Sequence, residues 1–468
     1  MTRLSHRVHA GRVHAGARFH VATIFGLAAA LGLGQAAWAQ TQTKVPGQVT
    51  FARDVAPILN ANCVRCHRSG EIAPMSLGTY NETRPWAKSI KERVVRRTMP
   101  PWFLDKNIGI QKYKNNPSLS DADIATIASW VDGGAPKGNP VDMPAAQKGD
   151  DLTTWRIGEP DLIVNYPEFT MPAHGADLYG TIQTPFGMKE DRYIMAIQSK
   201  VADSESRKVV HHALSYAVEP GQETAMGDDS GGGSGQFLVE YASGKNATFY
   251  DNDAGVLLAA GQNAMVSYHF HSVADEVKVH LQLGIKFYPK GYVPRHIQWS
   301  KQLGQEGAPD LDIPAGQVVR RDGYTRLNHA AMITAWQPHM HIRGKYQCLE
   351  LIYPVEPVVA ETVTCAGWNY NWHTIYNYED DVQPIVPAGT LLHVISWYDN
   401  TDANPYNPDA KNWVGAGTGR TIDEMGFSWI GWYDLSDAEY KAAVAARKAQ
   451  QTGPPKGTTV AALDPGRQ

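Results

Sequence analysis

The chain has 468 residues, enough for two to four domains of roughly 100–200 residues each. Its 43% hydrophobic and 19% charged residues are typical of a globular protein, and the net charge of −4 gives no indication of a nucleic-acid partner. The 17 histidines, several of them in pairs, instead direct attention to metal binding.

The first 39 residues are predicted to be a signal peptide. Basic residues precede a short apolar run at 21–33, and Ala37-Trp38-Ala39 forms an A-x-A cleavage site before Gln40. The alternative is an uncleaved membrane anchor, but the run is shorter than the about 20 residues that span a bilayer. We therefore expect a periplasmic or secreted protein without stable membrane insertion.

The region 48–138 is predicted to be a small all-α domain. Apolar residues at helical spacing predict helices over residues 51–60, 84–97 and 120–132. Ser120 is expected to be the N-cap of the third helix, with Asp123 at its third position. A polar linker is expected at 138–153.

The string Cys63-Val64-Arg65-Cys66-His67 is the signature for covalent attachment of haem c, with a stray redox or zinc pair as the alternative. The thiols of Cys63 and Cys66 would add to the vinyl groups, and His67 would become an axial iron ligand. For the sixth ligand we expect Met99, because the following proline holds its loop extended, and Met75 is the rival. The stretch resembles a small cytochrome c domain, including its closing residues 130–136.

From residue 155 the hydrophobic pattern of the sequence changes. Short alternating apolar runs, separated by Gly, Pro, Asn and Asp, predict antiparallel β-sandwiches or jelly rolls. We expect two all-β domains, at 155–300 and 301–435, followed by a helix at 436–448 and a disordered tail that ends at 468. The expected strands include residues 161–166, 193–197, 209–218, 264–270, 277–288, 331–336 and 391–397.

The other two cysteines, Cys348 and Cys365, remain after the haem motif is assigned. In an exported protein such a pair is most simply a disulfide, and a metal site is the weaker alternative.

Four motifs carry possible metal ligands. The first sandwich contains His211-His212 and the strand Tyr268-His269-Phe270-His271, in which His269 or His271 offers a third nitrogen. In the second sandwich, His339-Met340-His341 places two imidazoles on one face of a strand. The last motif is Asp423-Glu424-Met425, where a methionine precedes an apolar strand.

Together these motifs resemble the copper type II, ascorbate-dependent monooxygenases, the family of peptidylglycine α-hydroxylating monooxygenase and dopamine β-monooxygenase. The resemblance covers about residues 155–435, and it is closer still to bacterial proteins that fuse such sandwiches to a cytochrome c domain. It implies two copper ions. One is held by His211, His212 and His269, and the other by His339, His341 and Met425. These donor atoms suit copper, because a thioether beside two imidazoles favours Cu(I).

The resemblance also implies the reaction. Molecular oxygen would be used at the His339/His341/Met425 copper to hydroxylate a C–H bond of a small organic substrate, and the other copper would supply the second electron. The haem would pass on electrons from an ascorbate-like reductant or a periplasmic redox protein. Residues that grip the peptide carboxylate in the amidating enzyme are replaced here by Gln337, Phe427 and Trp429, so a peptide terminus is not expected as substrate.

Other interpretations stay open. A non-catalytic electron-transfer or copper-binding cytochrome c fusion would use the same ligands. The strand around His280 resembles the family in a place where the histidine is not a ligand. His329, His373 and His393 are expected to be structural.

Overall fold

A computed structural model describes residues 47–69, 73, 75–145, 154–222, 235–242, 247–250, 253–304, 311–417 and 421–450. The predicted signal peptide, residues 146–153 of the predicted linker and the C-terminal tail lie outside these ranges. No helix among the described residues is long and apolar enough to cross a membrane.

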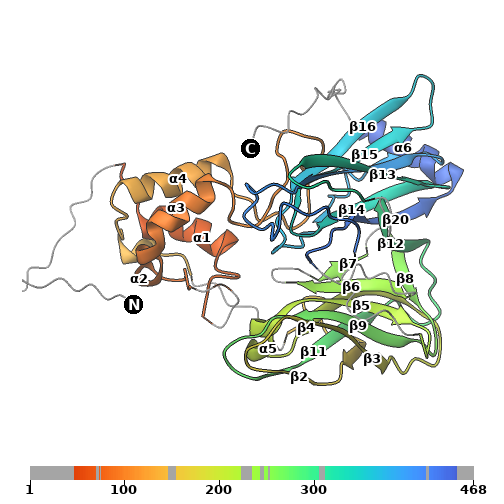
Figure 1. Cartoon of the computed structure of the whole chain (residues 1–468), viewed down its shortest axis with the longest axis horizontal. Helices are drawn as coiled ribbons and strands as arrows, with labels where there is room; N and C mark the ends of the chain where they lie inside the picture. The colour runs from red at the N-terminus through yellow and green to blue at the C-terminus, as the bar shows by residue number, and fades with distance from the viewer. Residues whose placement is uncertain are drawn as a thin grey trace, which may run out of the picture. The chain divides into compact units, whose positions relative to one another are not determined.

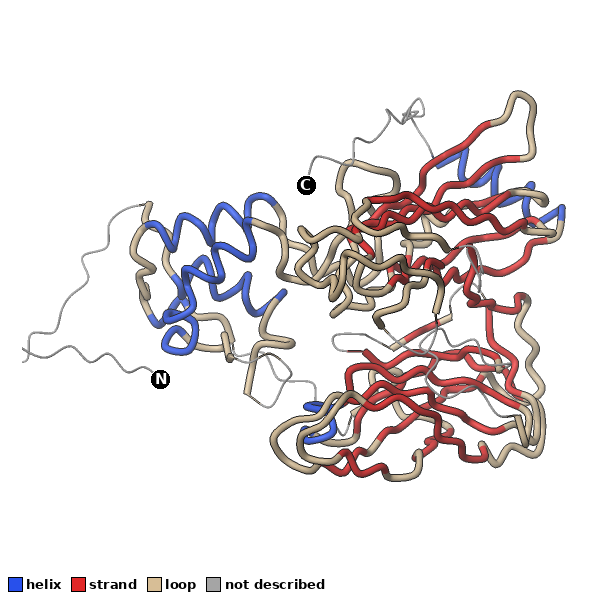
Figure 2. Tube along the Cα trace, in the orientation of Figure 1, coloured by secondary structure: helices blue, strands red, loops and turns tan. Residues whose placement is uncertain are grey.

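The region from residue 51 to residue 142 is helical, as predicted (Figure 2). The third predicted helix begins with a capping box in which Ser120 and Asp123 satisfy each other's backbone N–H groups. The region has its own apolar core, built around Phe51, Leu59, Ile127 and Trp130. Its elements are η1 (Phe51–Val55), α1 (Ala56–Asn62), α2 (Tyr80–Thr83), η2 (Arg84–Trp86), α3 (Ala87–Val95), α4 (Asp121–Asp132) and η3 (Pro140–Asp142).

The first β-sandwich packs a four-stranded sheet, in the order β3-β9-β5-β6, against the sheet β1-β11-β4-β8, to which β7 is added (Figure 1). The core between them consists of alternate residues of both sheets, which is why the sequence there alternates. The strands are β1 (Leu162–Asn165), β2 (Phe169–Met171), β3 (Leu178–Pro185), β4 (Arg192–Val201), β5 (Val210–Val218), β6 (Gln236–Ala242), β7 (Thr248–Phe249), β8 (Ala254–Leu258), β9 (Asn263–Phe270), β10 (Val277–Val279) and β11 (Leu281–Phe287).

The second β-sandwich packs the sheet β13-β19-β15-β16 against the sheet β12-β20-β14-β17, to which β18 is added (Figure 1). The strand β12 pairs with β8 of the first sandwich and with β20 of the second, so the boundary expected near residue 300 falls inside a strand. The strands are β12 (His296–Gly304), β13 (Val318–Arg326), β14 (Ala330–Met340), β15 (Gly344–Tyr353), β16 (Val359–Gly367), β17 (Tyr376–Asn377), β18 (Ile385–Val386), β19 (Leu391–Asp399) and β20 (Gly426–Leu435).

Two local predictions differ from the structure, and one short helix was not predicted. The strand expected at 277–288 is interrupted at His280, whose ring lies between Asp203 and Glu168. A short helix, α5 (Ser204–Val209), precedes β5 and is capped by Asp203. Residues 84–97 form η2 followed by α3, because Pro85 occupies the first turn of η2. The last helix, α6 (Asp437–Gln450), lies where it was expected.

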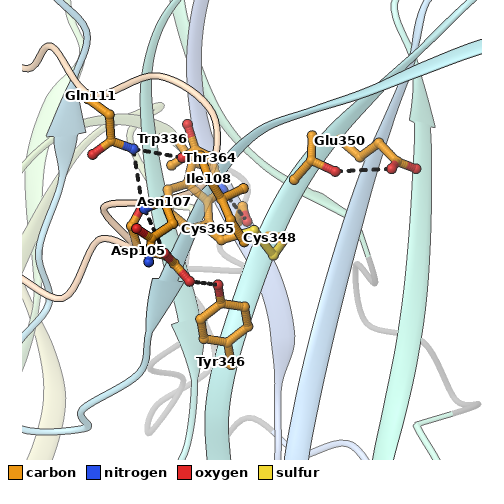
Figure 3. Close-up of a disulfide and its surroundings, with 12 residues drawn as sticks. Asp105, Asn107, Ile108, Gln111, Trp336, Tyr346, Cys348, Glu350, Thr364 and Cys365 are labelled. Atoms are coloured by element: carbon orange, nitrogen blue, oxygen red, sulfur yellow. Dashed lines mark hydrogen bonds between the residues drawn. A yellow bond between two sulfur atoms is a disulfide. The ribbon is translucent and has the colours of Figure 1, made fainter. Parts of the chain in front are cut away.

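The loop between α3 and α4 packs on the second sandwich. Ile110 donates its backbone N–H to the carbonyl of Val363, and Asp105 accepts a hydrogen bond from the Tyr346 hydroxyl, as Figure 3 shows beside the disulfide. Gly109 has a φ of +63°, and a Cβ atom there would lie 2.2 Å from the Val363 carbonyl oxygen. Only glycine therefore allows this approach.

The predicted disulfide is confirmed. Cys348 and Cys365 face each other as direct partners in the β15–β16 pair, with Cα atoms 4.1 Å apart (Figure 3). Both cysteines are buried, and they pack with Ile395 against Ile108 of the α3–α4 loop. The bond therefore lies on the face of the sheet opposite Leu349, which points into the core between the two sheets.

Candidate metal centre

Three histidines of the first sandwich come together on β5 and β9. One ligand atom from each of His211, His212 and His269 lies within 4.8 Å of the others. The ring centroids of these three side chains are 4.7–5.3 Å apart. Imidazoles that share one metal ion, each with its nitrogen about 2 Å from the ion, have centroids separated by about 5 Å. The trio is therefore spaced for a single metal ion.

A register shift explains how two adjacent histidines reach one site. Neighbouring residues of a regular strand point to opposite faces. Between Val210 and His212, however, the pairing of β5 with β9 is irregular, and His212 is left directly opposite His269. Such a bulge re-aims the bulged side chain, here that of His211. Sequence periodicity contains no signal for this.

Asp177 orients the third imidazole. Its carboxylate oxygens lie 2.7 Å from Nε2 of His269 and 2.7 Å from Nδ1 of His271. The hydrogen bond at Nε2 leaves Nδ1 of His269 as the nitrogen for a metal, and a carboxylate partner of this kind is common behind metal-binding histidines. The structure thus brings His269 into the trio, while the His271 side chain is exposed.

His212 and His269 are buried and His211 is half-buried, and this burial disfavours the charged form of all three imidazoles. Burial lowers the pKa of His211 to about 3, and it lowers the pKa values of His212 and His269 as well. The Nδ1 atoms of His211 and His269 are buried without a hydrogen-bond partner. Leaving such a nitrogen unsatisfied costs about 1–3 kcal/mol, and a metal ion would satisfy both. Neutral imidazoles with an available lone pair are the form that binds metals.

The second set of predicted ligands lies where β14 ends and β20 begins. His339 is in β14, His341 follows its last residue, and Met425 precedes the first residue of β20. His339 is paired with Phe427, and Met340 with Gly426, so that continuing the register puts His341 opposite Met425. Alternation along both strands therefore places His339, His341 and Met425 on one face of the sheet. All three side chains are buried.

The two imidazoles of this set also have ring nitrogens that are available to a metal ion. Nδ1 of His341 lies 3.0 Å from the carbonyl oxygen of Asp423, which leaves Nε2 available. The Nε2 atoms of His339 and His341 are both buried without a hydrogen-bond partner. Burial lowers the pKa of His341 to about 4 and that of His339 well below its usual value.

Glu424 fixes the chain around this set. Its carboxylate accepts the backbone N–H groups of His341, at 2.9 Å, and Arg343, at 2.6 Å. Burial raises the pKa of Glu424 to about 8. The side chain therefore ties the end of β14 to the residue before Met425. Both Glu424 oxygens accept backbone N–H groups, so they are not directed at a metal ion. This contact explains why the motif contains an acidic residue.

The two sets meet at His373, which lies in the loop between β16 and β17. Its ring centroid is 5.0 Å from that of His212 and 5.5 Å from that of His339. A charge on His373 is among the causes that lower the pKa of all five predicted histidine ligands. From the sequence we expected His373 to be structural.

The positions that distinguish this chain from the amidating enzyme are occupied by packed side chains. Gln337 donates to the buried Glu240 at 3.1 Å, and Phe427 stacks on His339 with centroids 4.5 Å apart. Trp429 packs on Phe237 at 4.4 Å in an apolar cluster formed by both sandwiches. Packing and hydrogen bonding within the protein therefore account for the residue types at these three positions, and no substrate contact is needed to explain them.

Three further histidines, His280, His329 and His393, lie outside both predicted ligand sets. His393 is buried and lies 2.9 Å from Glu350 and 2.7 Å from Asp322, so both of its ring nitrogens are occupied. His280 is likewise held between Asp203 and Glu168, and His329 is exposed. None of the three lies in the trio.

The predicted haem ligands lie in the helical region. Cys63 ends α1 and Cys66 follows within the next turn, and burial raises the pKa of Cys63 to about 12. Nδ1 of His67 lies 3.3 Å from the carbonyl oxygen of Met75, which orients the ring and leaves Nε2 for an axial bond. Met99 lines a cavity of about 90 Å³ together with Trp102, Leu119 and Ile124. The Met75 side chain packs against the helical core.

Comparisons with known proteins show no family. No family model matches the chain, and no curated protein matches it. Among solved structures, it is similar to the tandem CBM22 domains of Xyn10C from Paenibacillus barcinonensis, with 10% identity, 63% of this chain and 99% of that chain covered, and a TM-score of 0.16. A second similar structure is that of infectious bursal virus-derived T=1 particles, with 7% identity, 60% and 71% coverage and a TM-score of 0.18. At such TM-scores the likeness defines no common fold.

Proposed function

We propose that this protein is a copper- and oxygen-dependent monooxygenase that hydroxylates a C–H bond of a small organic substrate and receives electrons through a covalently bound c-type haem. One observation carries the proposal. Three imidazoles of one sandwich, two of them buried, meet beside two imidazoles and a thioether that share a sheet face in the next. Two unlike sets would hold two metal ions, of which one would store an electron and the other would use oxygen.

The choice of metal follows from the donors. Zinc rarely recruits a methionine, and magnesium or calcium requires oxygen ligands. Imidazoles with a thioether suit copper, and the thioether favours Cu(I), which is the state that reacts with oxygen. The bound copper ions would supply the one-electron chemistry. The available nitrogens of His211, His269, His339 and His341 fit this role, because each is buried and lacks a hydrogen-bond partner.

The chain's own residues contribute orientation, charge and exclusion of water. Asp177 holds the His269 ring through its 2.7 Å contact, and Glu424 holds the backbone at His341. The buried carboxylate of Glu240 would offset part of the positive charge that a metal ion would bring into the protein. The apolar cluster around Met425 and Trp429 keeps water away from the thioether side of the second set.

The proposed electron entry is the helical region, interpreted as a cytochrome c domain. His67, oriented by the Met75 carbonyl, and the thiols of Cys63 and Cys66 fit the attachment of haem c. Met99, three residues before Trp102, is the proposed sixth ligand. Trp102 contacts Tyr376 of the second sandwich with centroids 4.8 Å apart, which supports a route for electrons from this region toward the copper sites.

The proposal is tested with the exported full-length chain, loaded with Cu(I) under anaerobic conditions. Metal analysis should give two copper ions and one haem iron per chain. Oxygen uptake with ascorbate as reductant, combined with a mass-spectrometric screen for hydroxylated small organic compounds, should reveal turnover. Met425→Leu, which keeps the volume but removes the sulfur, should abolish turnover and leave the haem absorption spectrum unchanged.

Met332→Leu on β14 of the same sandwich is the matched control, because Met332 is only partly buried and packs at the far side near α6. Full turnover in Met425→Leu would contradict the assignment of the second set. Absence of bound copper in the unchanged protein would contradict the proposed function as a whole, and copper without any oxygen-coupled product would favour electron transfer alone.

A further inference from the structure

An aromatic series of four side chains links the helical region to the second set of predicted ligands. Its members are Trp102, Tyr376, Trp336 and Phe427. The series begins at Trp102, in the loop between α3 and α4, which lines the same cavity as Met99, the proposed sixth ligand of the haem. The Trp102 ring meets that of Tyr376 on β17 edge to face, with centroids 4.8 Å apart. The series therefore enters the second sandwich beside a proposed haem ligand.

Inside the sandwich the series continues through buried rings. Tyr376 is the direct partner of Trp336 in the β14–β17 pair, and the two rings are stacked with centroids 5.6 Å apart. Both residues are buried and belong to the core between the two sheets, where side chains are close-packed. The indole nitrogen of Trp336 donates a hydrogen bond to the hydroxyl of Ser428, at 2.9 Å.

The series ends at a predicted copper ligand. The covalent neighbour of Ser428 is Phe427, which is buried and stacks on His339 with ring centroids 4.5 Å apart. This stacking is fixed by strand register, because Phe427 and His339 are direct partners in the β14–β20 pair. Ring contacts, one hydrogen bond and one stretch of backbone thus join Trp102 to His339 through the interior of the sandwich.

The trio has different neighbours. The rings that contact its imidazoles are those of Tyr179, Tyr370 and His373, and none of these three belongs to the series. Electron transfer through a protein slows steeply when bonded and packed groups give way to gaps. Which of two metal sites receives an electron first is therefore decided by the contacts that lead to each site, and the contacts from Trp102 lead to His339.

We propose that the aromatic series carries electrons from the haem to the second set of ligands, so that this set and not the trio is where electrons enter the copper sites. The inference rests on the proposed function, which supplies the haem and the copper ions. In each transfer the ferrous haem iron loses one electron and becomes ferric, and Cu(II) at the second set gains this electron and becomes Cu(I). No bond forms or breaks, and no proton moves.

The first experiment identifies the electron acceptor. In the full-length chain with ferric haem and Cu(II), pulse radiolysis without oxygen reduces the haem, and absorbance follows its return to the ferric form. The return should stay fast in His269→Ala, which empties the trio, and should be lost in His341→Gln, which empties the second set. Metal analysis of each variant shows which set is empty. A return that persists in His341→Gln, or that is lost in His269→Ala, would overturn the inference.

The second experiment tests the route with the same measurement. Trp102→Leu should slow the return of the haem severalfold, and Trp102→Tyr, which keeps an aromatic ring, should restore most of the rate. Trp299→Leu is the matched control, because Trp299 is also partly buried against the same core but lies outside the series. Equal rates in Trp102→Leu and Trp299→Leu would overturn the route while leaving the proposed function intact. If the unchanged chain binds no copper or no haem, the proposed function itself fails.

Discussion

The Nε2 atom of His269 lies 2.7 Å from a carboxylate oxygen of Asp177, and the Nδ1 atom on the other side of the same ring is buried among the imidazoles of the trio. The second carboxylate oxygen of Asp177 lies 2.7 Å from Nδ1 of His271. One carboxylate therefore contacts both His269 and His271. The first is directed into the protein and the second toward solvent.

The first prediction concerns Asp177. Asp177→Asn removes the charge that holds the His269 ring in its tautomer, so the copper affinity of the trio should fall about 10- to 100-fold. Competition with a Cu(I) chelator measures this change. Asp275→Asn, at an exposed acidic position near the end of β9, is the control and should have no effect. Equal affinities in the two variants would show that Asp177 has no part in orienting the ligand.

The second prediction separates His269 from His271. His269→Ala should lose one of the two copper ions, because it removes a buried donor of the trio. His271→Ala should keep both ions, since its side chain is exposed and only shares Asp177. Metal analysis after gel filtration gives the stoichiometry. The reverse outcome, with copper lost only from His271→Ala, would exchange the roles of the two histidines.

The third prediction concerns the disulfide. Cys348→Ala combined with Cys365→Ala opens a loop with a sequence separation of 17 residues, and such a cross-link is worth about 3 kcal/mol. The unfolding transition of the second sandwich should move to a lower denaturant concentration, followed by tryptophan fluorescence. Thiol titration of the denatured, unreduced chain should detect neither cysteine. An unchanged transition in the double variant would mean that the bond does not contribute to stability.

The fourth prediction is a pH dependence at α6. Glu439 accepts hydrogen bonds from the backbone and the hydroxyl of Ser436 and forms an ion pair with Arg295, and these contacts lower its pKa from the usual 4.5 to about 2. A lowered pKa in the folded state contributes stability above about pH 4.5, and this contribution is lost as the pH falls toward 2.

Glu439→Gln should therefore destabilise α6 at neutral pH by about 1 kcal/mol at most, since the site is largely at the surface. The difference from the unchanged protein should shrink between pH 4.5 and 2. Hydrogen exchange of the α6 amides, compared between the two proteins at each pH, measures it. Glu276→Gln, at an exposed position, is the control. A difference that grows on acidification would have the wrong sign for this explanation.

Local signals in the sequence were sufficient for much of the fold. The capping pair Ser120 and Asp123 begins α4 as predicted, because a capping box involves residues only three positions apart. Alternation identified β5, β9 and β19, since each has one face in a sandwich core. The break at His280 was missed, because it depends on Asp203 and Glu168, which are distant in the chain.

For the candidate site, the sequence by itself determined which residue types are present, that His339 and His341 share one face of a strand, and that Met425 precedes a strand. Only the tertiary structure decided that His269 rather than His271 joins the trio, that a bulge turns His211 toward His212, and that His373 reaches both sets. The physical reason is that side-chain direction within a strand follows from local alternation, whereas convergence depends on register shifts and on packing between segments more than one hundred residues apart.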